Sequence, residues 1–132
     1  MRLVDNVMKG DFLQDVYQNI GFVYKIDEVV HIQLLEGPDV GQSTHNLISP
    51  VQLTENFLMK NLLFVKETDI YREYFYQDGG PDGFRIYVRV CEDKTIFVEA
   101  ADRTDICAKN IQFVHELQHV FKMFNIKIEW VL

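Results

Sequence analysis

Short segments in which hydrophobic and polar residues alternate fill the first third of the chain. Residues 30–34 alternate Val, Ile and Leu with His and Gln, which is the period-two pattern of a strand with one buried face. Residues 22–26 are β-prone, and residues 47–48 begin a further short strand before Pro50. Several short strands within roughly 50 residues predict a small SH3-like β-barrel in this part of the chain.

The second half of the chain predicts an antiparallel meander. Residues 70–77 are aromatic and β-prone, and residues 84–91 alternate clearly between hydrophobic and polar. The glycine-rich residues 78–83 between them form the strongest turn signal in the chain. We expect a third strand over residues 95–100 and a last strand over residues 127–131.

Residues 110–124 carry the longest helical pattern. Val114, Leu117 and Phe121 recur three or four positions apart and form an apolar stripe that should lie on the sheet. A shorter helix begins at Thr54, whose hydroxyl is a good N-cap. These patterns predict an α+β fold, in which a small SH3-like β-barrel-type module is followed by an antiparallel β-meander packed by one long C-terminal helix.

The predicted elements suggest two modules. Their boundaries are 1–52 for the β-barrel-like module, 53–66 for a short linking helix, and 67–132 for the antiparallel sheet with its C-terminal helix. The two modules either remain separate or pack as a single domain. A chain of 132 residues, of which 48% are hydrophobic, is long enough to bury a core without disulfides.

Charge and composition narrow the kinds of partner and the compartment. The chain has 13 Lys and Arg against 20 Asp and Glu, a net charge of −7, and no basic stripe. Nucleic-acid binding depends on counterion release at clustered basic residues, so this balance argues against it. No apolar run approaches the ~18 residues of a membrane span, and no signal peptide is apparent. The cysteines, Cys91 and Cys107, make no disulfide framework, so we expect reduced thiols in a cytoplasmic protein.

One string of residues in the helix of residues 110–124 matches a known catalytic motif. His115, Glu116 and His119 fit the pattern H-E-x-x-H. On a helix the two histidines lie one turn apart, where they could bind one zinc ion, and the glutamate could activate a zinc-bound water as general base. The string therefore raises the hypothesis of a zinc-dependent hydrolase.

The surroundings of this string weaken that hypothesis. A catalytic zinc ion needs a third protein ligand, and Glu129 is the sole carboxylate downstream of the motif. His31 or His45 could serve only if the first module folds over this helix. We therefore favour a structural role, in which His115 and Gln118 hydrogen-bond backbone groups at the end of the sheet.

Two segments carry a family resemblance. Residues 49–64, SPVQLTENFLMKNLLF, resemble the segment "pIpLTeeiLeknGF", and residues 111–119, IQFVHELQH, resemble the helix "ikYVHeLQn". Both occur in a family of small uncharacterised proteins from gut bacteria, their phages and mobile elements. The resemblance implies that the helix is structural, and it implies no activity. The chain departs from the pattern at Leu62 and Leu63, where the family usually has Gly, so the turn after the short helix is expected to differ.

The face of residues 84–91 opposite the hydrophobic one is a candidate binding surface. Arg85, Tyr87 and Arg89 on this face form either a cation–aromatic interaction surface or a plain solvated face. The main hypothesis is a non-catalytic protein-interaction or structural module that binds a protein or a second copy of itself. The alternatives are a zinc hydrolase with His115, Glu116 and His119, and a nucleic-acid-binding adaptor.

Overall fold

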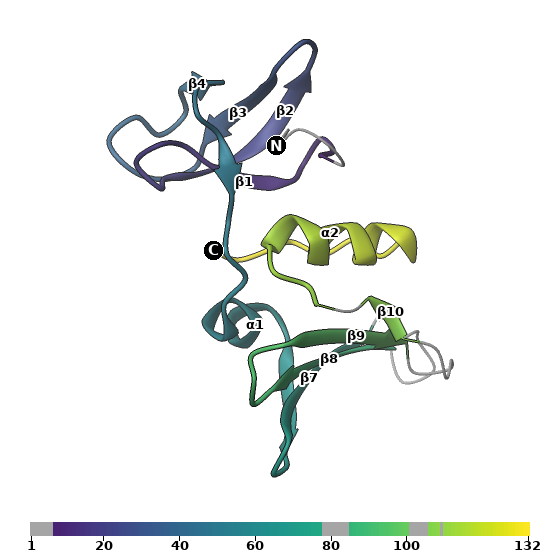
Figure 1. The fold of residues 1–132 in the computed structure, drawn as a ribbon. Helices are drawn as coiled ribbons and strands as arrows, with labels where there is room; N and C mark the ends of the chain where they lie inside the picture. Colours follow the sequence, from purple (N-terminus) through teal and green to yellow (C-terminus); the bar gives the residue numbers. More distant parts are fainter. Residues whose placement is uncertain (1–6, 78–84, 101–105, 109) are drawn as a thin grey trace. The chain divides into compact units, whose positions relative to one another are not determined.

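The computed structural model describes residues 7–77, 85–100, 106–108 and 110–132 (Figure 1). It is α+β, as expected, with antiparallel sheets and two helices in the described part. Contacts divide the chain into unit 1, residues 1–52 and 113–118, and unit 2, residues 53–112 and 119–132. The predicted turn at 78–83 and the side chain of Cys107 lie outside the described residues. No helix among the described residues is both long enough and apolar enough to cross a membrane.

Unit 1 contains one antiparallel sheet with the strand order β4-β3-β2-β1-β5. Its strands are β1 (Phe12–Gln14), β2 (Ile20–Ile26), β3 (Val30–Leu34), β4 (Ser43–Thr44) and β5 (Ser49–Pro50). The two edge strands are two residues long and are not paired with each other, so the described sheet is open. The closed SH3-like barrel expected from the sequence is therefore not observed, because two-residue edges provide too few hydrogen bonds to close it.

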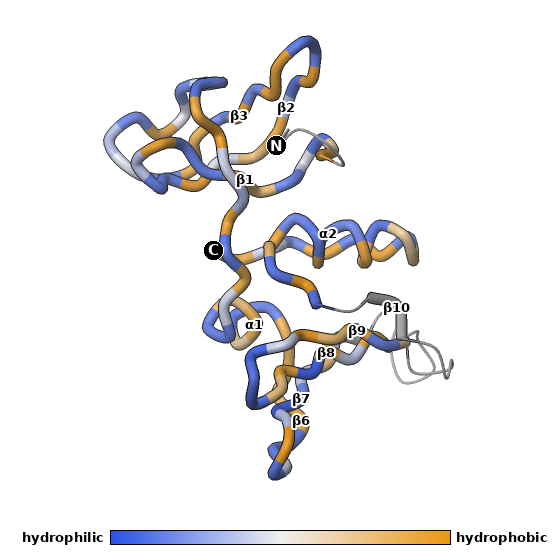
Figure 2. Tube along the Cα trace, in the orientation of Figure 1, coloured by the Kyte–Doolittle hydropathy of each residue, from blue (hydrophilic) through white to orange (hydrophobic). Residues whose placement is uncertain are grey.

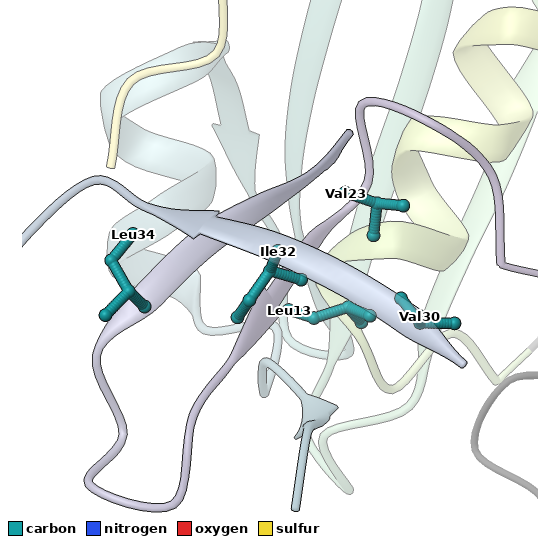
Figure 3. Packing of buried hydrophobic residues seen from close by; sticks show 5 residues of the cluster. All are labelled: Leu13, Val23, Val30, Ile32 and Leu34. Carbon is teal, nitrogen blue, oxygen red and sulfur yellow. The ribbon is translucent and has the colours of Figure 1, made fainter. Parts of the chain in front are cut away.

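The core of unit 1 comes from the inward side chains of this sheet. They are Leu13, Val23, Val30, Ile32 and Leu34, each at most 4% exposed (Figure 3). The alternation predicted for residues 30–34 is confirmed, because the three hydrophobic residues are buried and the two polar residues between them are half-buried. Gly21 allows β2 and β3 to approach closely, since a Cβ there would lie 2.6 Å from the backbone oxygen of Gln33.

Unit 2 contains the second antiparallel sheet, with the order β10-β9-β8-β7-β6. Its strands are β6 (Leu63–Glu67), β7 (Tyr71–Gln77), β8 (Arg85–Cys91), β9 (Ile96–Ala100) and β10 (Ile106–Ala108). Neighbouring strands in the chain are neighbours in the sheet, which agrees with the predicted meander (Figure 1). Ile86, Val88 and Val98 on one face are completely buried.

Helix α1 (Glu55–Asn61) begins where the sequence predicts. The Thr54 hydroxyl accepts a hydrogen bond of 3.2 Å from the backbone N–H of Phe57, which confirms the N-cap. Phe57 packs on Trp130, with 5.7 Å between ring centroids, and Trp130 meets Phe121 edge-on at 4.9 Å. Phe121 in turn contacts Tyr76 of β7, so this aromatic cluster belongs to the buried side of the unit 2 sheet.

Helix α2 (Val114–Met123) is shorter than the predicted helix. It begins four positions after residue 110, because Asn110 has a positive φ of 55° and the next two residues are hydrogen-bonded outside the helix. The Ile111 N–H donates to the Ile96 oxygen, and the Gln112 oxygen accepts from the Leu53 N–H. Hydrophobic residues lie along one side of α2 and polar residues along the other (Figure 2). The long C-terminal helix expected from the sequence is thus a helix of ten residues.

Residues 127–131 do not form the predicted strand. The side-chain amide of Asn61 instead takes the place of a neighbouring strand. Its Nδ2 donates to the Val131 oxygen at 2.8 Å, and its Oδ1 accepts from the Val131 N–H at 2.6 Å. The backbone N–H and oxygen of Val131 are therefore hydrogen-bonded by one side chain and not by a neighbouring strand.

Candidate functional site

The faces of the unit 2 sheet differ in composition. One face holds the buried hydrophobic residues of β8 and β9, and the opposite face holds half-buried aromatic and charged residues. We call this second face the outer face. Its residues, taken from the strand register, are Tyr71, Glu73, Phe75, Arg85, Tyr87, Arg89, Cys91, Phe97 and Glu99. The structure thus places the sequence-predicted Arg85, Tyr87 and Arg89 side by side on one accessible face.

Arg89 is the centre of an ion-pair network on the outer face. Its Nε donates to Glu73 Oε2 at 2.7 Å, and its Nη1 donates to Glu99 Oε2 at 3.0 Å. Glu73 and Glu99 are on β7 and β9, the strands on either side of β8. The hydrogen bond to Glu73 is the main reason that the pKa of Arg89 is raised above its usual range. The guanidinium also lies over the Tyr71 ring, 5.1 Å from its centroid.

This network fixes Arg89 and leaves it little capacity to bind anything else. The side chain of Glu73 is only 5% exposed, although it lies on an otherwise accessible face. A buried carboxylate of this kind is stable only when it is paired and hydrogen-bonded, which Arg89 provides. We conclude that Arg89 and its two carboxylates form a rigid floor for the outer face, in which one guanidinium offsets one of the two negative charges.

The free binding groups lie next to this floor. Phe75 on β7 faces Tyr87 on β8, with 6.1 Å between ring centroids and an interplanar angle of 32°. Arg85, two residues before Tyr87, has no ion-pair or hydrogen-bond partner among the described residues. The outer face therefore presents a half-buried aromatic pair beside the Arg85 guanidinium, which is available to bind a partner.

The outer face continues onto an exposed apolar edge. β6 is an edge strand, and all five of its residues are exposed. Leu63 is 65% exposed and is the register partner of Phe75, so it lies on the outer face, whereas Phe64 is the register partner of Tyr74 and belongs to the opposite face. Lys66 reaches back over the Tyr71 ring, 5.9 Å from its centroid. The aromatic pair and the edge strand thus form one continuous accessible surface.

The structure gives the glutamate of the H-E-x-x-H string a structural role. Glu116 Oε1 accepts a hydrogen bond of 2.9 Å from the backbone N–H of Phe113, at the first turn of α2. This is the contact of a helix N-terminal capping box, in which an acidic residue reaches back to an otherwise unsatisfied N–H. The carboxylate that a hydrolase would need as general base is thus engaged with the backbone.

The two histidines of the string have different surroundings. His115 is 8% exposed and stacks on Phe113, with 6.0 Å between ring centroids and an interplanar angle of 15°. His119, one turn later, is half-buried. His31, considered from the sequence as a third ligand, instead contacts Asp27 at 3.1 Å. Among the described residues, no three His, Cys, Asp or Glu side chains are grouped so that they could hold a metal ion.

Gln118 has the backbone role expected for it. Its Oε1 accepts from the Phe12 N–H at 2.8 Å, and its Nε2 donates to the Gly10 oxygen at 3.0 Å. The side chain is buried, with 3% of the residue exposed. The amide therefore stabilises the start of β1 in unit 1.

No family model matches the chain, and no curated protein and no solved structure matches it.

Several residues of the outer face were not singled out from the sequence. Phe75, Glu73 and Glu99 join the site only through the pairing of β7 and β9 with β8. The period-two pattern of residues 70–77 indicates which of its residues share a face, but it does not indicate the register against β8. Arg85, Tyr87 and Arg89 could be found because they lie two residues apart on a single strand.

Proposed function

We propose that this protein is a non-catalytic interaction module that binds a protein partner through the outer face of the unit 2 sheet. The observation that carries this proposal is the half-buried Phe75–Tyr87 pair beside the uncommitted guanidinium of Arg85. Aromatic residues and arginine supply most of the binding energy in protein interfaces. Their association on a face with a rigid ion-pair floor is the arrangement expected of a preorganised interface.

The chemistry of the face defines the partner that it fits. Phe75, Tyr87 and the exposed Leu63 suit apolar side chains, whereas Arg85 suits a carboxylate. The charges of Glu73 and Glu99 on this face are offset by those of Arg89 and Arg85, so the face does not repel an acidic partner strongly. The partner is therefore a protein surface with hydrophobic residues next to an Asp or Glu.

Three wider assignments belong to the same proposal. The free thiol of Cys91 supports a reducing compartment, namely the cytoplasm. The resemblance of residues 49–64 and 111–119 supports an association with a phage or a mobile element. The five short antiparallel strands of unit 1 support an opened form of the SH3-like plan.

Site-specific photo-cross-linking tests the proposal. A photoreactive phenylalanine analogue replaces Tyr87 in one protein and Ile26, which is 43% exposed on unit 1, in a second. In lysate of the source cell, we expect position 87 to capture a discrete protein that position 26 does not capture. Excess unlabelled wild-type protein should prevent this capture, and excess Arg85→Glu/Tyr87→Ala protein should not.

Direct binding to the captured protein then gives a quantitative result. Tyr87→Ala and Arg85→Glu should each weaken the affinity about tenfold or more, as for central interface residues. Ile26→Ala, the matched control, should leave it unchanged. Fluorescence of Trp130, which packs in the aromatic cluster of unit 2, verifies that each variant is folded. Equal affinity of wild type and a folded Tyr87→Ala variant would overturn the proposal.

A further inference from the structure

A polar hollow of about 330 Å³ opens on unit 1 and is separate from the outer face. It is lined by the turn after β1, by the end of β3 and by the segment that leads through β4 to Asn46. All its residues belong to unit 1. Its volume is at the lower end of the range typical of sites for small ligands or single side chains.

Asp15 is the main polar group of this hollow. The residue is only 8% exposed. Its Oδ1 accepts hydrogen bonds from the backbone N–H groups of Tyr17 at 2.9 Å and Asn19 at 2.8 Å, which fixes the turn after β1. Its Oδ2 has no partner among the described residues. This oxygen is not sealed off from solvent, so it is open to an N–H donor of a ligand, with which a carboxylate forms a strong, charge-assisted hydrogen bond.

The charge of the lining residues determines whether that ligand is a cation or an anion. Asp39 adds a second carboxylate, and no Lys, Arg or His is among the residues that line the hollow. The side-chain amides of Gln42 and Asn46 have no hydrogen-bond partner among the described residues, so they provide further acceptors. An anion would be repelled here, and a cation with several N–H donors would be bound.

The apolar part of the lining selects the shape of the ligand. Val16 and Leu34 provide hydrophobic contact for an aliphatic stem. Tyr17, 80% exposed at the rim, offers an aromatic ring to a cation. An aliphatic stem that ends in several N–H donors describes the side chains of lysine and arginine.

We propose that this hollow binds the ammonium or guanidinium group of a lysine or arginine side chain, with Asp15 Oδ2 as the central acceptor and Tyr17 covering the cation. The same chemistry is found in a basic peptide and in a free alkylguanidine or alkylamine. The experiment below separates these two sources. The site is independent of the partner proposed for the outer face, since the two surfaces share no residue.

Titration of the full chain with defined probes, followed by NMR of its backbone amides, tests this proposal. The probes are acetyl-Gly-Arg-Gly-amide and acetyl-Gly-Lys-Gly-amide. The neutral control is the matched citrulline peptide. We expect saturable shifts at Tyr17, Asn19 and Asn46 with the basic peptides, weakened by salt, and none with citrulline. The affinity of butylguanidine separates the two sources of the cation. If butylguanidine binds as tightly as the arginine peptide, the ligand is a free small molecule. If it binds more weakly than the arginine peptide, the ligand is a peptide.

Variants identify the groups that bind the cation. Asp15→Asn keeps the Oδ1 acceptor for the turn and replaces Oδ2 by a donor, so it should weaken binding about tenfold or more. Glu28→Gln, an exposed change of the same charge in unit 1, should leave binding within about twofold. If Asp15→Asn does not fold, the exposed variants Asp39→Asn and Tyr17→Leu test the same site and should each weaken binding.

Three results would overturn the proposal. They are equal shifts with the citrulline peptide, unchanged affinity in a folded Asp15→Asn or in both exposed variants, and shifts that saturate with Ca²⁺ but not with either basic peptide.

Discussion

The side-chain amide of Gln118 hydrogen-bonds the backbone at Phe12 as a neighbouring strand would. One atom of the amide accepts from the Phe12 N–H at 2.8 Å, and the other donates to the Gly10 oxygen at 3.0 Å. The two residues are 106 positions apart in the chain. A single side chain from the middle of α2 thus completes the hydrogen bonding at the start of β1.

Removing this amide should destabilise unit 1. Gln118→Met keeps the length of the side chain but leaves the Phe12 N–H and the Gly10 oxygen without partners. Each unsatisfied buried group costs about 1–3 kcal/mol, so we expect a loss of about 2–4 kcal/mol in the free energy of unfolding. Urea unfolding measures the loss, and hydrogen exchange should show faster exchange of the Phe12 amide.

A companion variant and a control sharpen this prediction. Gln118→Glu keeps the acceptor but cannot donate to Gly10 while it is ionised, so it should be destabilised at neutral pH and partly recover when acid protonates it. Gln52→Ala, at an exposed glutamine of the same unit, should change stability by less than about 0.5 kcal/mol. Unchanged protection of the Phe12 amide in Gln118→Met would contradict the structural role.

The capping role of Glu116 makes a prediction that distinguishes it from a catalytic base. Glu116→Gln keeps an oxygen that can accept from the Phe113 N–H, and Glu116→Ala does not. We expect a loss of about 0.5–1 kcal/mol for Glu116→Ala and a smaller loss for Glu116→Gln, measured by thermal unfolding. Glu129→Ala, an exposed change of the same charge, serves as the control. Zinc-dependent peptide hydrolysis that disappears in a fully stable Glu116→Gln would argue for the hydrolase instead.

Acid should weaken unit 2 through Glu55. Its carboxylate accepts hydrogen bonds from Arg72, one of them 2.7 Å long, and from the Tyr74 hydroxyl at 2.6 Å. The bond from Arg72 is the main cause that lowers the pKa of Glu55 from its ordinary value of 4.5. A lowered folded-state pKa gives stability that is present above pH 4.5 and is lost as the pH falls below it.

Glu55→Gln should remove this dependence on pH. We expect a loss of about 1 kcal/mol at neutral pH, since the group is partly exposed, and a flatter decline of stability in acid. The same variant should lower the pKa of Tyr74, which is raised to about 12 by burial first and by the Glu55 bond second. Unfolding monitored by Trp130 fluorescence and alkaline titration of tyrosinate absorbance test the two parts. If the stability of Glu55→Gln falls in acid as steeply as that of the wild type, the predicted role of Glu55 in the pH dependence is contradicted.

Two glycines of unit 1 should respond differently to alanine. At Gly21 a Cβ would lie 2.6 Å from a backbone oxygen of β3, so the strands must separate, and we expect a loss of about 2–3 kcal/mol. At Gly41 the space is open but φ is +88°, so only backbone strain of about 1 kcal/mol is expected. Urea unfolding followed by circular dichroism measures both. Equal losses would show that β2 and β3 accommodate the methyl group.

Sequence patterns that lie within one short segment of the chain were sufficient to predict part of the fold. The alternation of residues 30–34 and 85–91 identifies β3 and β8, and Thr54 identifies the start of α1. The same alternation places Arg85 and Tyr87 on one face. These features depend only on the geometry of a strand or of a helix end, which neighbouring residues determine.

Features that depend on distant partners could not be found in this way. β4 and β5 are too short to show a period, and β6 is exposed along its whole length, so no alternation marks it. The apolar pattern of the C-terminal helix extends back to Ile111, yet the helix starts at Val114 because Ile111 and Gln112 are hydrogen-bonded to residues distant in the chain. The role of Glu73 in the candidate site likewise depends on the register of β7 against β8.

The irregular pairing of β6 has a consequence for the behaviour of the protein in solution. An exposed apolar edge strand would ordinarily template the addition of further strands and lead to aggregation. The register of β6 against β7 shifts between Phe64 and Lys66, so a bulge interrupts the row of backbone groups, and a lysine follows it directly. The side chain of Leu63 thus stays available to a shaped protein surface on the outer face, while a flat strand from another chain finds no regular edge on which to polymerise.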